Sequence, residues 1–173
     1  MRVRSLDTMG PAEIQGLCDV LIDCVEGGAS VSFMLPMTRA KAEAFWSRTS
    51  AAHARGERIV VVAEDDDGAI IGTVMVLLDQ PENQPHRGDI AKMLVHRRAR
   101  RRGVGEALLV AAERKAAATG KTLLLLDTVS GSDAERLYRR LGWQRCGEVP
   151  GYALWPDGRP CPTTFFYKTL VQK

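Results

Sequence analysis

Two glycines follow a run of arginines in the middle of the chain, in the segment Arg100-Arg-Arg-Gly-Val-Gly105. The pattern around it predicts a strand over Asp89–Val95 before the segment and a helix over Glu106–Thr119 after it. Glycine lets a backbone approach an anion closely, and the N–H groups and dipole of a helix N-terminus attract negative charge. The sequence therefore predicts a phosphate-binding loop.

Three other interpretations of the neighbouring residues are weaker. Gly103-Val-Gly105 lacks the third glycine of a dinucleotide fingerprint, because position 108 is Leu. Gly120-Lys-Thr122 resembles the end of a P-loop, but position 115 is Lys and a strand follows, which favours a helix C-cap. The basic run His96–Arg102 is typical of a solvated face or a nucleic-acid surface. Its place directly before Gly103 favours phosphate binding.

A second motif follows the loop. Leu123–Asp127 predicts a buried strand, and Ala134–Trp143 predicts a helix that carries Tyr138. Together with Arg100-x-x-Gly103-x-Gly105, this segment resembles the GNAT superfamily of acetyl-CoA-dependent N-acetyltransferases. The resemblance implies an α/β fold of the GNAT-like acyl-CoA N-acyltransferase type, with a mixed, mostly antiparallel sheet flanked by helices. It also implies acetyl-CoA as the acetyl donor.

Within the superfamily, the chain is most similar to the acetyltransferases of tabtoxin resistance. The similarity covers residues 89 to 170 well and the N-terminal half loosely. It is carried by Ala91–Val95, Leu126–Thr128, Gly147–Tyr152, Pro156–Gly158 and Tyr167–Leu170. This implies a small acceptor amine, such as an amino-acid-like toxin or antibiotic.

The resemblance also implies which residues hold acetyl-CoA. The backbone of Met93, Leu94 and Val95 is expected to pair with the pantetheine arm as a strand would. The pyrophosphate is expected at the loop, on Arg100, Arg101, Arg102, Gly103, Val104, Gly105 and Glu106. One position differs: Gly131 stands where many members carry an Asn that contacts pantetheine.

Acetyl transfer to an amine needs a base and an acid. An amine with a pKa near ~10.4 costs roughly 4.6 kcal/mol to deprotonate at neutral pH, and a carboxylate is the usual proton acceptor. Asp127 and Asp89 are candidate bases because each lies at an end of a predicted strand, and strand-end capping or an ion pair is the alternative role. The resemblance places Tyr138 beside the thioester sulfur. From there its hydroxyl can protonate the departing thiolate at a cost of about 2 kcal/mol, and a core tyrosine is the alternative.

Composition narrows the class of protein. With 173 residues, 45% of them hydrophobic, the chain is expected to form one domain over residues 1–173. A net charge of +3 is too small for a dedicated nucleic-acid binder. No apolar run reaches the ~20 residues of a membrane span, and the first residues do not resemble a signal peptide, so we expect a cytoplasmic protein without membrane or nucleic-acid partners. A monomer or homodimer is expected.

The cysteines and histidines do not suggest a metal. Cys18, Cys24, Cys146 and Cys161 lack metal-ligand spacing and are expected to be ordinary buried or half-buried thiols.

The remaining pattern predicts helices over residues 11–25 and 38–49, and strands over 59–63, 70–78, 144–149 and 163–170. Residues 29–37 and 79–88 are expected to be loops. The aromatic and Met side chains near the first loop fit either satellite core or acceptor contact: Phe33, Met34, Phe45 and Trp46.

The sequence thus predicts direct acetyl transfer from acetyl-CoA to a small-molecule amine in a ternary complex. Two alternatives stay open at this point. One is a protein N-acetyltransferase, and the other is a non-catalytic module that binds coenzyme A or nucleic acid.

Overall fold

The computed structural model describes residues 1–170, whose seven strands form one sheet in the order β1-β2-β3-β4-β5-β7-β6. The strands are β1 (Arg2–Ser5), β2 (Arg58–Glu64), β3 (Ile70–Leu77), β4 (Arg87–Val95), β5 (Leu123–Val129), β6 (Gln144–Leu154) and β7 (Pro160–Thr169). Only β4 and β5 pair in parallel, and every other neighbouring pair is antiparallel. The expected mixed, mostly antiparallel sheet is confirmed.

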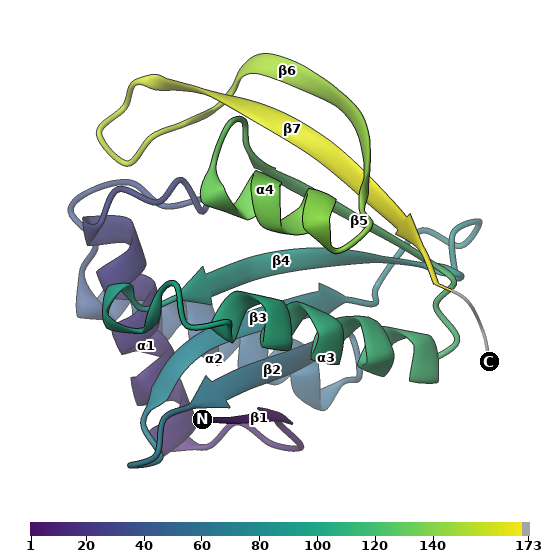
Figure 1. Cartoon of the computed structure of the whole chain (residues 1–173). Helices are drawn as coiled ribbons and strands as arrows, with labels where there is room; N and C mark the ends of the chain where they lie inside the picture. The colour runs from purple at the N-terminus through teal and green to yellow at the C-terminus, as the bar shows by residue number, and fades with distance from the viewer. Residues whose placement is uncertain (171–173) are drawn as a thin grey trace.

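Helices cover both faces of this sheet (Figure 1). Helices α1 (Pro11–Glu26) and α2 (Arg39–Ala54) pack on one face, and α3 (Val104–Ala118) packs on the other. The short helix α4 (Asp133–Arg140) follows β5 and contributes to the core on the α3 side. The sheet is therefore the middle layer between two hydrophobic cores.

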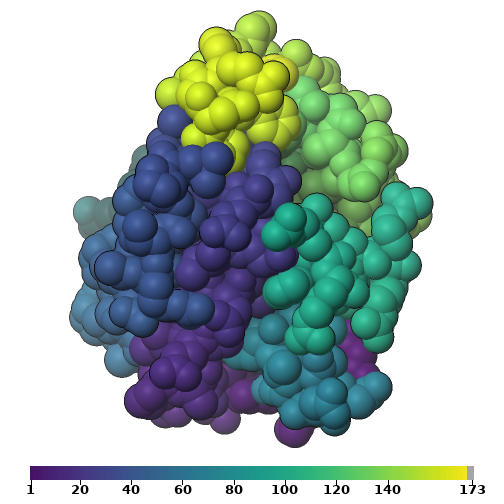
Figure 2. Space-filling model, turned by 90° about the vertical axis from the view of Figure 1, so that its left-hand side faces the viewer, coloured from purple at the N-terminus to yellow at the C-terminus, as the bar shows by residue number. Residues whose placement is uncertain are grey.

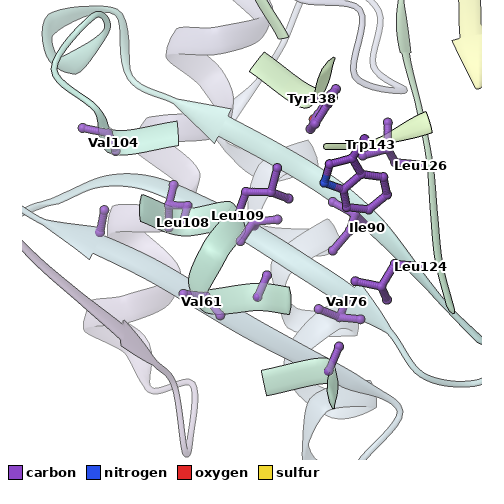
Figure 3. Close-up of a cluster of buried hydrophobic side chains, with 14 of the residues drawn as sticks. Val61, Val76, Ile90, Val104, Leu108, Leu109, Leu124, Leu126, Tyr138 and Trp143 are labelled. Atoms are coloured by element: carbon purple, nitrogen blue, oxygen red, sulfur yellow. The ribbon is translucent and has the colours of Figure 1, made fainter. Parts of the chain in front are cut away.

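The core beneath α3 fixes the position of the predicted phosphate loop. Val104, Leu108, Ala112 and Ala116 recur every four residues and are all buried, which is the spacing of one helix face. Figure 3 shows Leu108 and Leu109 of α3 in one cluster with side chains of the sheet, such as Val61, Val76 and Ile90. Fully burying one leucine contributes about 1.5–3 kcal/mol, so this stripe holds the helix N-terminus firmly against the sheet.

The sheet opens between β4 and β5. These two strands pair only where Arg87–Asp89 faces Leu123–Leu125. Beyond Asp89 they diverge, and β5 instead pairs along its length with β7 (Figure 1). One edge of β4 is therefore left without a strand partner near its C-terminal end.

Several element boundaries differ from the sequence prediction. Strand β1 was not predicted, because a strand of only four residues is too short to give a periodic signal. Helix α3 begins at Val104, so Gly105 lies in its first turn and not in the loop. A short 3-10 turn at Arg97–Ala99 interrupts the basic run. Cys146 is exposed, contrary to the expectation of a buried or half-buried thiol, because it lies on the edge strand β6.

Within residues 1–170, no helix is long and apolar enough to cross a membrane.

Candidate active site

A cavity of about 1340 Å³ lies where β4 and β5 diverge. Its walls come from the 27–34 segment, β4, the loop and first turn of α3, the end of β5, α4 and the β6–β7 hairpin. Figure 2 views the side of the molecule where the 29–37 segment (dark blue), the loop near residue 100 (teal) and the β6–β7 turn (yellow) come together. Elements far apart in the sequence thus enclose one space.

A second cavity, of about 540 Å³, lies between α1 and the β2–β3 turn. Its charged side chains form ion pairs with one another, such as Arg4 with Glu64 and Arg39 with Asp19. It contains none of the predicted site residues. The larger cavity is therefore the candidate active site.

The predicted phosphate loop forms one wall of the larger cavity. Gly103 is the N-cap of α3 and has a φ of 76°, a conformation that favours glycine. A Cβ atom added to Gly103 would meet no atom within 4 Å, so the space beside this backbone is open. A free helix N-terminus next to open space is the arrangement that binds phosphate groups.

Gly105 also lines the cavity, and it stands where two other elements approach the helix closely. A Cβ atom there would lie 2.8 Å from Cε of Met93 and 3.2 Å from Cδ2 of Leu137. Gly105 therefore allows β4 and α4 side chains to pack closely against the first turn of α3. Val104 is buried and anchors this turn in the core, and both Val104 and Glu106 line the cavity.

The structure separates the arginines of the basic run. Arg100 and Arg101 line the cavity, whereas Arg102 does not. Arg97 and Arg98 form ion pairs with Asp23 and Asp65, respectively. Part of the run is thus a charged surface that links neighbouring elements, and of its arginines only Arg100 and Arg101 face the cavity.

We expect Arg100→Ala to weaken coenzyme A binding about three- to tenfold and to flatten its salt dependence, because a cation near the phosphates is lost. Dissociation constants should be measured from about 0.01 M to about 0.15 M salt, over which the Debye length falls from about 30 Å to about 8 Å. Arg102→Ala is the matched control and should leave the affinity and the salt slope unchanged. An equal effect of both substitutions would show that Arg100 acts only as a surface charge.

The free edge of β4 forms the floor of the cavity. Met93, Leu94 and Val95 all line it, and Leu94 and Val95 are paired with β3 on their other side. Unpaired N–H and C=O groups at a strand edge are strong hydrogen-bonding groups that an extended ligand can use. This geometry fits the predicted pairing with a pantetheine arm.

Tyr138 faces the same cavity from α4. It is 3% exposed and packs against Trp143 and Phe166, with ring centroids 6.0 Å and 6.1 Å away. Among residues 1–170, no group forms a hydrogen bond with its hydroxyl, so this oxygen is free for a ligand. Burial raises the pKa of Tyr138 well above its ordinary value, and the negative charge of Asp127 raises it further. The tyrosine therefore carries its proton throughout the physiological pH range.

Asp127 reaches the cavity from β5. It is accessible through the cavity, yet the surrounding protein removes much of its water, and this desolvation raises the pKa of its carboxyl. The positive charge of Lys92 opposes the rise, and the charge of Asp89 adds to it. A carboxylate with a raised pKa is a better proton acceptor than an ordinary one.

The structure does not bring Asp89 into the cavity. Asp89 pairs with Leu125 in the short parallel ladder, before the strands diverge. Its carboxylate forms an ion pair with Arg87 and accepts a hydrogen bond from Gln80 Nε2 at 3.1 Å. The ion-pair role, left open by the sequence, is the one that this geometry supports.

For several aromatic and Met side chains, the sequence left open whether they belong to the core or to the cavity. Phe33 and Met34 line it, whereas Trp46 is fully buried in the core beneath α1 and α2. Lys92 also lines it and was missed. A lysine inside the otherwise apolar stretch Ile90–Val95 was the available signal, because such a charge interrupts a strand pattern.

Gly131 lines the cavity at the position where the resemblance noted in the sequence implies an Asn, and it has a φ of 74°. Its N–H donates a hydrogen bond of 2.5 Å to Oε2 of Glu135. The backbone at this position is therefore held by the first turn of α4. A side-chain contact to pantetheine from position 131 is absent in this chain.

No three His, Cys, Asp or Glu side chains within residues 1–170 are grouped to hold a metal ion.

Comparison with known proteins identifies the family. Residues 29–143 match the model of the acetyltransferase (GNAT) family. An uncharacterised N-acetyltransferase from the hisH-hisA intergenic region of Azospirillum brasilense is 30% identical over 127 residues, which are 72% of this chain and 73% of that protein.

Solved structures show the same fold. A ribosomal-protein-alanine N-acetyltransferase from Brucella melitensis superposes with a TM-score of 0.82 at 23% identity, over 98% of this chain and 100% of that one. A phosphinothricin acetyltransferase from Sinorhizobium meliloti, solved in complex with acetyl-CoA, gives 0.80 at 22% identity, over 98% and 89% of the chains. The chain therefore belongs to the acetyltransferase (GNAT) family, whose enzymes use acetyl-CoA as the acetyl donor.

Proposed function

We propose that this enzyme transfers the acetyl group of acetyl-CoA directly to the amine of a small molecule, within a ternary complex. The observation that carries the proposal is the single cavity that joins the phosphate loop, the free edge of β4, Asp127 and Tyr138. This arrangement has one end suited to phosphates and another end suited to acid–base chemistry. Both substrates can therefore be bound at once.

The acceptor end favours a small molecule over a protein chain, because two of the segments that line the cavity are joined to each other there. Leu35 N donates a hydrogen bond to Pro156 O at 3.0 Å, and Ser30 Oγ donates one to Leu154 O at 2.7 Å. These bonds join the 29–37 segment to the β6–β7 hairpin at the wall of the cavity. A protein acceptor would have to reach past this tie.

In the proposed reaction, Asp127 accepts one proton from the acceptor ammonium and leaves a neutral amine. The amine nitrogen forms a bond to the acetyl carbon as the bond between that carbon and sulfur breaks. Tyr138 donates its proton to the departing thiolate. The nitrogen then loses its second proton, which restores the hydroxyl of Tyr138, and Asp127 releases its proton to solvent. Burial raises the pKa of Tyr138 and so makes it a weaker acid, but a thiolate that leaves within the same desolvated cavity also binds a proton more tightly than in water.

The similarity to tabtoxin-resistance acetyltransferases extends the proposal to amino-acid-like acceptors. Among the solved structures with this fold, one is named as a phosphinothricin acetyltransferase, which names a small molecule, and another as a ribosomal-protein-alanine N-acetyltransferase, which names a protein. At identities of 22% and 23%, these likenesses concern the fold only. We also propose that residues 1–173 act as one domain, because β1 and β7 belong to the same sheet.

The proposal is tested by thiol release from acetyl-CoA with a panel of small amines and a matched panel of peptides. Turnover of small amines with kcat/KM well above that of any peptide is expected. Turnover of peptides alone would establish a protein N-acetyltransferase. Binding of acetyl-CoA without turnover of either panel would indicate a sensor, and tight salt-dependent binding of DNA would indicate a nucleic-acid function.

We expect Asp127→Asn to lower kcat/KM most at neutral pH and less at alkaline pH, where the amine loses its proton unaided. General-base catalysis contributes roughly 10²–10⁴-fold, which bounds the loss at neutral pH. The pKa of the Asp127 carboxyl is raised, so the rate of the unchanged enzyme should fall as pH drops through a value above the ordinary carboxyl range. Asp89→Asn is the matched control. If Asp89→Asn shows the larger loss, the two carboxylates have been assigned the wrong way round.

A further inference from the structure

Lys92 stands at an irregular point of β4. Thr73 of β3 pairs with Leu94 and Met75 pairs with Ala91, so Val74 alone faces both Lys92 and Met93. This is a β-bulge, a device that redirects a side chain at the edge of a sheet. Lys92 has a φ of 50°, which is unfavourable for a residue with a Cβ atom. The strained backbone presents the lysine to the cavity, which suggests a function for the side chain.

The ammonium group of Lys92 has few partners. It donates one hydrogen bond, to Ser32 Oγ at 3.1 Å, and lies 5.8 Å and 5.6 Å from the ring centroids of Phe33 and Phe45. No carboxylate within residues 1–170 forms an ion pair with it. Three N–H donors thus share one oxygen acceptor in a half-buried position.

Two other lysines in protected positions, by contrast, each have two hydrogen-bond acceptors for the ammonium group. Lys168 bonds Glu113 Oε2 at 2.7 Å and Leu141 O at 2.8 Å. Lys121 bonds the carbonyl oxygens of Leu78 and Pro85 at 3.0 Å and 2.8 Å. Lys92 lacks an equivalent set, and the loss of water at its position lowers the pKa of its ammonium. The cavity therefore contains a cation that is short of acceptors.

Asp127 supplies the opposite charge elsewhere in the same cavity. The two groups form no ion pair, yet each affects the pKa of the other. A cavity with a separate cation and a separate carboxylate is complementary to a zwitterion. An acceptor that places its amine at Asp127 can place an anionic group at Lys92.

We propose that Lys92, with Ser32, binds a carboxylate or similar anionic group of the acceptor, so that the substrates of this enzyme are amino acids or close analogues. This inference rests on the proposed transfer to a small amine and adds the group that the acceptor must carry beside its amine. The rings of Phe33 and Phe45 hold the ammonium in place through cation–π contacts and limit its access to water.

The test uses acceptors that differ only in the anionic group: an L-amino acid, its amide and the corresponding decarboxylated amine. The unchanged enzyme should prefer the amino acid. Lys92→Met keeps an unbranched side chain without the charge, and should raise KM for the amino acid about a hundredfold while leaving KM for the amide unchanged. Lys92→Arg should retain the preference. Coenzyme A affinity should be equal in all three proteins.

Three results would overturn the inference. One is equal use of the amino acid and the amide by the unchanged enzyme. Another is a Lys92→Met variant that still prefers the amino acid over its amide, or whose affinity for coenzyme A falls by as large a factor as its KM for the amino acid rises. The third is transfer of an acetyl group to Lys92 itself, detected by peptide mass spectrometry after incubation with acetyl-CoA.

Failure of the proposed function can be told apart from failure of this inference. If no small amine is acetylated, calorimetric titration of the coenzyme A-loaded protein with the amino acid and its amide still reports on Lys92. Binding that prefers the amino acid, and that loses this preference in Lys92→Met, supports the anion site. Equal binding of both compounds, or of neither, refutes it.

Discussion

Tyr138→Phe is expected to lower kcat by roughly 10²–10⁴-fold, the usual contribution of a general acid, with nearly unchanged affinity for acetyl-CoA. The substitution keeps the ring that packs against Trp143 and Phe166 and removes only the hydroxyl. That hydroxyl forms no hydrogen bond with any group in residues 1–170, so its loss leaves no partner unpaired and should change stability little. Single-turnover rates, which report the chemical step, are the measurement.

A matched control is available in the same protein. The hydroxyl of Tyr167 donates a 2.5 Å hydrogen bond to Gln144 Oε1 and lies outside the cavity. Tyr167→Phe should therefore leave the rate unchanged. Because the pKa of Tyr138 is raised, no tyrosine ionisation should appear on the alkaline side of the pH profile of the unchanged enzyme. A Tyr138→Phe enzyme with full turnover in the chemical step would make this residue part of the core, with solvent as the proton source.

Gly103→Val is expected to weaken coenzyme A binding by about a hundredfold or more. At a φ of 76° a β-branched residue is strained, so the backbone at the N-terminus of α3 must move, and the new side chain occupies the open space where phosphate approaches. Losing two charge-assisted hydrogen bonds from backbone N–H groups accounts for about 3 kcal/mol or more. The measurement is calorimetric titration with coenzyme A. Gly103 is a cleaner target than Gly105, where valine would also collide with Met93.

Gly120→Val separates this effect from lost stability. Gly120 lies just beyond the other end of α3, has a φ of 82°, and likewise has no atom within 4 Å of an added Cβ. The two substitutions therefore impose a similar backbone strain at opposite ends of one helix. Thermal unfolding should shift by comparable amounts in both, while only Gly103→Val should lose affinity. Similar coenzyme A affinity in Gly103→Val and the unchanged protein would refute the phosphate-loop assignment.

Local signals were sufficient for most of the elements and for one end of the site. The glycines, the arginines and the uninterrupted helix pattern after them predicted the loop at the N-terminus of α3, because phosphate binding depends on one short segment of backbone. The apolar strand that ends at Asp127 and the helix that carries Tyr138 were predicted for the same reason. Strand β1 and the first turn of α3 were misjudged, since short segments carry too few residues for a periodic signal.

The acid–base end depended on contacts between distant segments. Asp89 and Asp127 look alike as residues at strand ends. Only the short β4–β5 ladder shows that the strands diverge after Asp89, so that Asp127 reaches the cavity while Asp89 is held by Arg87. Similarly, the sequence did not separate Phe33 in the cavity wall from Trp46 in the core, because both lie in apolar surroundings.

The sequence by itself determined the family, and it predicted the cofactor loop and the tyrosine, because all three depend on residues close together in the chain. Only the tertiary structure decided which carboxylate lines the cavity and that Lys92 lines the same cavity. The bulge that redirects Lys92 arises from the pairing of β4 with β3. The hydrogen bond of the Lys92 ammonium is accepted by Ser32, which lies 60 residues earlier in the chain. Such a register shift depends on two strands at once, and no local pattern of residues in either strand encodes it.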